Sequence, residues 1–122
     1  ERARFFATSE DAEEFLAGLA RAAATQVSFS TKDCDAVCNT LIREVDVFTN
    51  NVAHESKIGR VYLTPSIEKQ IMSDHFLVEQ GEIERAHWHF FASSVSNTVG
   101  PSQQVLDLLN KVDVDYTIHL PA

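Results

Sequence analysis

The chain has 122 residues and a formal net charge of -8, because 18 acidic side chains outnumber 10 basic ones. This surplus of carboxylates repels phosphate backbones and anionic lipid surfaces, so we expect no nucleic-acid or membrane partner and instead a protein with exposed Lys and Arg. No apolar stretch approaches the roughly 20 residues that span a bilayer, and the length fits one compact domain, residues 1–122.

The first part of the chain predicts a strand, a helix and a second strand. Residues 2–7 alternate as a strand buried on one face does. Thr8 stands in the N-cap position with Asp11 three residues later, and apolar residues then recur at helical spacing over 9–23. Residues 26–30 alternate again, which indicates the second strand.

The two cysteines, Cys34 and Cys38, are four residues apart in a segment with a helical pattern. On a helix they would share one face, where a disulfide across a single turn would be strained. The pair also supplies only two of the four ligands of a structural zinc site. We therefore expect reduced, buried thiols, which favour a cytoplasmic location.

The middle of the chain is ambiguous, because helical and strand spacings overlap around Val45. We expect a strand over 44–49, a polar loop over 50–59 and a returning strand over 60–64. These segments would form a long hairpin whose loop is available for binding.

The second half predicts two helices and three strands. Thr64 and Pro65 suit the start of a short helix over 65–73, and strands over 76–80 and 83–93 would form a hairpin. A helix over 102–112 and a strand over 114–120 complete the chain. This order predicts an α+β two-layer sandwich, with a mainly antiparallel sheet and helices packed on one face.

His87 and His89 lie two residues apart on a predicted strand, so they project from the same face together with Arg85. Trp88 and Phe90 mark the opposite face as the core side. Two neighbouring imidazoles can share a metal ion or act as acid and base, but catalytic zinc needs three protein ligands, and the charge of Arg85 disfavours a cation. Candidates for the third position are His54, His75, His119, Glu82 and Glu84.

Motifs of several other chemistries are missing from the sequence. The four glycines are scattered and form no phosphate-binding loop, and no G-x-S-x-G nucleophile motif occurs. Neither histidine of the pair begins an H-x-T motif. The basic residues are dispersed and outnumbered, which excludes a basic nucleic-acid surface.

The leading interpretation is therefore a non-enzymatic acidic protein-binding module without a cofactor. It would be an inhibitor or a bacterial immunity protein that neutralises a toxin or nuclease by covering its basic surface. The carboxylates expected to meet that partner are Asp46, Glu55, Asp74, Glu82, Glu84, Asp113 and Asp115. The alternative is a small metal-dependent or acid-base enzyme built on His87 and His89, with His119 as a further ligand. Pairing of exposed edge strands into a homodimer is a third possibility.

Overall fold

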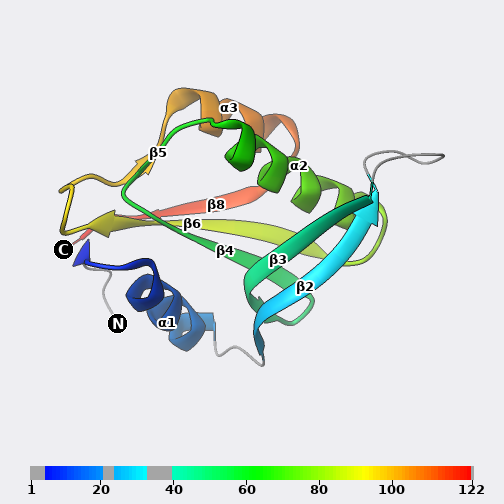
Figure 1. The fold of residues 1–122 in the computed structure, drawn as a ribbon, viewed down its shortest axis with the longest axis horizontal. Coiled ribbons are helices and arrows are strands. Elements are labelled where there is room, and N and C mark those ends of the chain that lie inside the picture. Colours follow the sequence, from blue (N-terminus) through cyan, green and yellow to red (C-terminus); the bar gives the residue numbers. More distant parts are fainter. Residues whose placement is uncertain (1–4, 21–23, 33–39, 122) are drawn as a thin grey trace.

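In the computed structural model, which describes residues 5–20, 24–32 and 40–121, the chain forms three helices and a curled mixed sheet (Figure 1). The segment with Cys34 and Cys38 lies outside the described residues. The elements in chain order are β1 (Phe5–Phe6), α1 (Ser9–Ala20), β2 (Ala24–Lys32), β3 (Thr40–Thr49), β4 (Val52–Ile58), β5 (Arg60–Val61), α2 (Pro65–Glu79), β6 (Arg85–Ser93), β7 (Gly100–Pro101), α3 (Gln103–Lys111) and β8 (Asp115–His119).

The main sheet runs β1-β6-β4-β3-β2, and β8 also pairs with β6. Strand β3 is antiparallel to both β2 and β4, whereas β4, β8 and β1 all run parallel to β6. The expectation of a mainly antiparallel sheet is therefore wrong. The physical reason is that α2 lies between β4 and β6 and α3 between β6 and β8, and such helical crossovers return the chain in the same direction.

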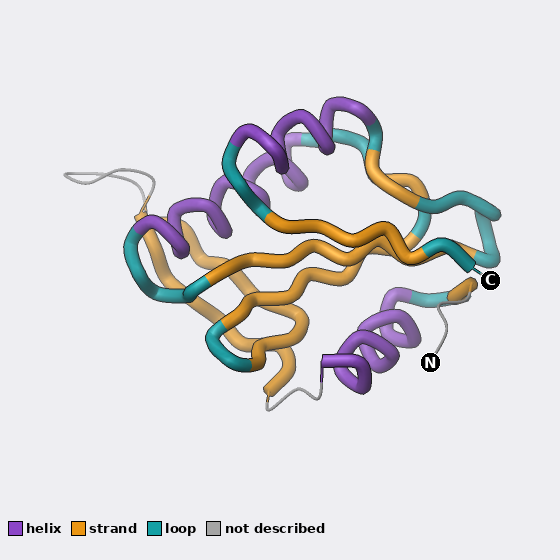
Figure 2. Tube along the Cα trace, turned by 180° about the vertical axis from the view of Figure 1, so that it is seen from behind, coloured by secondary structure: helices purple, strands orange, loops and turns teal. Residues whose placement is uncertain are grey.

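The helices cover both faces of the sheet, not one as expected. Helices α2 and α3 lie on one side and α1 on the other, as the two opposite views show (Figure 1, Figure 2). Strand β6 serves both sides because its side chains alternate: Trp88 and Phe90 join the core under α2 and α3, while Phe91 packs with Phe6 and Phe15 under α1.

The predicted loop over residues 50–59 is a strand for most of its length. Asn50 and Asn51 have φ angles of 51° and 62° and form a two-residue turn, after which β4 begins at Val52. Two consecutive residues with positive φ are typical of the tight turns that join antiparallel strands. The structure therefore pairs β3 directly with β4, and the side chains of β4 become part of the sheet.

The predicted strand over 76–80 is also wrong, because α2 continues to Glu79 and buries Leu77 in the main core. The strand predicted over 83–93 is observed as β6, and the last helix and strand are observed as α3 and β8. The N-cap roles of Thr8 and Thr64 are confirmed, since each side chain accepts a hydrogen bond from the backbone N–H three residues later. Among the described helices, none is long and apolar enough to cross a membrane.

Candidate metal centre

Three histidines from two neighbouring strands converge on the face of the sheet that α1 partly covers. His87 and His89 come from β6, as their spacing predicts, and His54 comes from β4, directly opposite His87 in the parallel register. One candidate nitrogen from each ring lies within 4.8 Å of the others. His54, one of five candidates from the sequence, is thus the third member of the group.

Two of the ring nitrogens lie closer together than metal ligands do. His54 Nδ1 and His89 Nε2 are hydrogen-bonded at 2.9 Å. Nitrogens bound tetrahedrally at about 2.0–2.1 Å from a zinc ion are separated by roughly 3.3–3.4 Å, so a small outward movement of these two rings makes room for an ion. The His87 ring stacks on His89 with centroids 4.1 Å apart, and it has to turn for its lone pair to meet the other two.

Strand β8 supplies a hydrogen-bond partner for each histidine of β6. His89 Nδ1 lies 2.9 Å from His119 Nε2, and His87 Nε2 lies 2.7 Å from Thr117 Oγ1. If His89 held an ion through Nε2, its Nδ1–H would donate to His119. If His87 held the ion through Nδ1, its Nε2–H would donate to Thr117. Engagement of the second ring nitrogen fixes the tautomer and orientation of a ligating histidine.

The surroundings keep these imidazoles uncharged at neutral pH. Burial lowers the pKa of His89 to about 2, and the neighbouring histidines lower it further. Burial, with the charges of His87 and Arg85, lowers the pKa of His54 to about 4. Burial also lowers the pKa of His87 and of His119. Neutral imidazole is the form that binds a metal, so the cluster is ready to ligate without first losing a proton.

One end of this face is closed and the other is open. At the closed end His119 stacks on Phe91, with centroids 4.4 Å apart, and Phe91 is fully buried against Phe6 and Phe15 beneath α1. At the open end a cavity of about 450 Å³ is lined by His54 and His87 together with residues around the β3–β4 turn and the start of β6. A ligand would reach His54 and His87 from that end.

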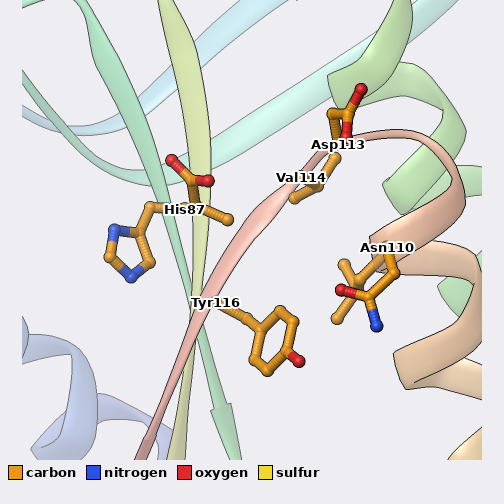
Figure 3. Close-up of a pocket in the computed structure, with 7 residues that line it drawn as sticks. His87, Asn110, Asp113, Val114 and Tyr116 are labelled. Atoms are coloured by element: carbon orange, nitrogen blue, oxygen red, sulfur yellow. The ribbon is translucent and has the colours of Figure 1, made fainter.

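A second hollow of about 410 Å³ lies at the start of β8 and also includes His87 among its lining residues. Figure 3 shows the His87 ring on one side of the sheet and Asn110 and Tyr116 on the other. The hollow therefore follows the edge of the sheet, with the histidine cluster on one face and α3 on the other. It does not bring Asn110 or Tyr116 into the cluster.

The remaining candidates for the third position do not join the histidine group, although Glu84 lines the same cavity as His54 and His87. His75 is on α2, where its Nε2 lies 3.3 Å from Glu79 Oε1. Glu82 and Glu84 are exposed in the segment between α2 and β6. None of these three joins the group of His54, His87 and His89, and His119 takes part only as the neighbour of His89.

Two of the seven carboxylates expected on a partner-binding surface are buried, so the exposure expected of them is wrong. Asp74 is 1% exposed and Glu55 5%. Arg43 pairs with both, through Nε to Asp74 Oδ1 at 2.9 Å and through Nη2 to Glu55 Oε1 at 2.8 Å. Trp88 Nε1 donates to Asp74 Oδ2 at 2.8 Å, and Lys57 Nζ lies 2.9 Å from Glu55 Oε2. These groups form an internal ionic network on the α2 side of the sheet.

Asp46 is half-buried and interacts with groups of the protein itself. Its Oδ2 accepts a hydrogen bond from the Ser56 backbone N–H at 2.9 Å. Burial raises the pKa of Asp46 to about 8, and the charges of Glu55 and Glu13 add to this effect. The raised pKa favours the protonated form of the side chain at neutral pH, which lowers its contribution to an acidic surface.

The other four carboxylates are exposed. They lie in the two segments that precede or begin β6 and β8, which are parallel neighbours in the sheet. Glu82 and Glu84 precede β6, and Asp113 and Asp115 stand at the start of β8, which pairs with β6. We call these four residues the acidic rim. Arg85 lies among them, 3.8 Å from Asp115.

Comparisons of the chain with protein-family models, with curated proteins and with solved structures gave no match. Its function is therefore argued from the geometry of its own residues.

Proposed function

We propose that the protein binds a divalent transition-metal ion at His54, His87 and His89 and that this ion carries its function. The observation that supports the proposal is the convergence of the three rings, whose ligating atoms lie within 4.8 Å of one another. Three imidazoles suit zinc or its neighbours in the first transition row. This is the metal-dependent alternative predicted from His87 and His89, completed by a ligand from β4.

The burial and the hydrogen bonds of the rings favour a metal site. The alternative is a half-exposed face of the sheet whose histidines bind nothing. His89 is 7% exposed, and its burial among other imidazoles has no benefit for packing that an apolar residue would not give. Hydrogen bonds from β8 orient both histidines of β6, as at metal sites where the ligands are held by neighbouring groups.

Three protein ligands leave at least one position of a zinc ion open. Closed sites with four ligands are structural, whereas open sites bind water or a substrate. Such an ion lowers the pKa of its bound water and polarises substrate oxygens. The geometry therefore favours a site for metal-assisted chemistry, which replaces the cofactor-free interpretation as the leading hypothesis.

Metal content tests this proposal directly. After chelation has removed any metal, the chain is titrated with Zn²⁺ or Co²⁺ and should bind one ion. At a pH low enough for the histidines to be partly protonated, binding of the ion should release protons. Single substitutions His54→Gln, His87→Gln and His89→Gln should each weaken binding by about 100-fold or more, because each removes one of three ligands.

His75→Gln is the matched control, since His75 lies on α2 outside the cluster. It should leave the affinity and the stoichiometry unchanged. Failure of the wild-type chain to bind a stoichiometric ion would remove the proposal, and so would equal affinity in all four variants.

The acidic rim supports a second candidate function, binding of a protein with a basic surface. Its four carboxylates are exposed and lie in neighbouring segments, which is the arrangement that speeds association with a cationic partner. A partner captured through this surface should be released by salt, and substitution of Glu82 and Asp113 by Gln and Asn should weaken its capture. Recovery of no partner at low ionic strength would count against this function.

A further inference from the structure

The cavity beside the histidine cluster has one cationic side chain among its lining residues. Its volume of about 450 Å³ lies within the range of small-molecule sites. His54 and His87 form one part of its wall and Arg85 another. Because the closed end of the face is filled by the core under α1, the open position of an ion at the cluster is accessible from this cavity.

Arg85 is placed to act together with the ion. It precedes His87 by two residues on β6 and therefore lies on the same face, and it pairs across the sheet with Val52 as His87 pairs with His54. Its charge also reaches the imidazoles, since it contributes to lowering the pKa of both His54 and His87.

The guanidinium group is available to a ligand. Its contact in the structure is with Asp115, at 3.8 Å between Nη1 and Oδ2, and both side chains are more than half exposed. Exposed pairs at this separation contribute little, so a ligand can replace Asp115 at small cost. Glu84 also lines the cavity, but it is exposed, and its charge is screened by solvent.

The charge of the ligands determines what this site attracts. Three neutral imidazoles leave the full double charge of a bound ion uncompensated, in contrast to sites with thiolate or carboxylate ligands. An ion with that charge favours an anion at its open position, and a guanidinium group nearby can bind the other oxygens of the same anion in a fork.

We propose that the site binds a small oxyanion, a carboxylate or a phosphoryl group, with one oxygen on the metal ion and another on Arg85. This inference rests on the proposed metal site and gives it a class of substrate. The charge of Arg85 disfavours a cation at the histidines, as expected from the sequence, and an anion bound between the ion and the guanidinium group would offset that repulsion.

The test uses the full chain loaded with one equivalent of Co²⁺, whose visible spectrum reports both occupancy and a change of ligand. Inorganic phosphate and acetate are titrated separately into wild type, Arg85→Gln and the control Arg60→Gln. Arg60 is exposed on β5 and does not line the cavity. We expect at least one anion to change the spectrum of wild type and of Arg60→Gln, with affinity about 10-fold lower in Arg85→Gln at equal cobalt occupancy.

Each outcome separates the hypotheses. Binding of phosphate alone assigns a phosphoryl group, binding of acetate alone assigns a carboxylate, and binding of both supports the wider class. If neither anion binds the cobalt-loaded chain, or if Arg85→Gln binds as wild type does, the inference is overturned while the metal site stands. If wild type takes up no cobalt, the proposed function itself fails, and this is seen before any anion is added.

Discussion

Replacing His89 with glutamine should cost less stability in acid than at neutral pH. The pKa of His89 in the folded protein is about 2, compared with 6.5 for an unperturbed histidine. Because the folded value lies below the unfolded one, the unfolded chain takes up the proton first as the pH falls. Protonation of this residue therefore favours unfolding at every pH below about 6.5, and glutamine removes that effect.

The magnitude follows from the difference between the two states. Below the unfolded pKa, each pH unit lowers the free energy of unfolding by about 1.4 kcal/mol for a group that stays neutral when folded. His89 is buried, so this figure needs little correction for solvent. Between pH 7 and pH 5 its contribution falls by about 2 kcal/mol, and the cost of His89→Gln should shrink by the same amount.

A comparison of two variants is needed because Asp46 works in the opposite direction. Its pKa is raised to about 8, so acidification stabilises the fold through this carboxyl group and partly hides the histidine effect in wild type alone. Urea unfolding of wild type and His89→Gln, followed by the fluorescence of Trp88 with a chelator present, cancels the Asp46 contribution. The cost of the substitution should be constant between pH 7 and 8. An equal cost at pH 5 and pH 7 would refute the reasoning.

Two further substitutions test the groups around the site. Asp46→Asn should stabilise the protein at pH 7. The gain would be about 4 kcal/mol for a fully buried group and is about 2 kcal/mol after allowance for partial exposure. Urea unfolding at several pH values should show that the gain disappears toward pH 4. Thr117→Val should weaken Co²⁺ binding by about 10-fold, because His87 loses the oxygen that orients it, and a titration followed in the visible spectrum measures this.

Local patterns were sufficient to predict several elements of the fold. The cap at Thr8 and the spacing after it fixed α1, and the alternation of β6 correctly placed Trp88 on the core side. The apolar run of Phe76, Leu77 and Val78 fits a strand or a buried helix equally well, because a short run has no distinguishing period. Its helical state depends on packing of α2 in the core, which the local sequence does not record.

The sequence contains one turn signal at the position where β3 is followed by β4. Asparagine tolerates positive φ better than most residues, and Asn50 and Asn51 follow one alternating run and precede another. With the turn placed there, residues 52–58 would have been predicted as a strand. A loop over 50–59 leaves His54 among the candidate ligands but does not place it opposite His87.

The histidine cluster could be predicted only in part, because its third histidine depends on a parallel pairing. The spacing of His87 and His89 on one strand determines that they share a face. The register that brings His54 to them is set by the crossover through α2. The spacing of residues along one strand does not predict that register. The burial of Glu55 and Asp74 was missed for a similar reason, since their partner Arg43 comes from a third element.

The ionic network and the histidine cluster occupy opposite faces of the same strand, and this relates them physically. On β4, Glu55 points toward Arg43 and α2, while His54 points toward the imidazoles. A slip of one residue in the pairing of β4 would exchange these two faces. Such a slip would separate Arg43 from Glu55, one of its two buried carboxylate partners, and breaking a buried pair costs about 3–5 kcal/mol.

A well-packed apolar core would often be as stable as such a network, so overall stability is a weak reason for its presence. Its effect on register is larger. Arg43 from β3 holds Glu55 of β4 and Asp74 of α2 at once, and Trp88 of β6 donates to the same Asp74. These contacts favour the pairing in which His54 lies opposite His87. The polar groups buried on one face thereby help to set which residues meet on the other.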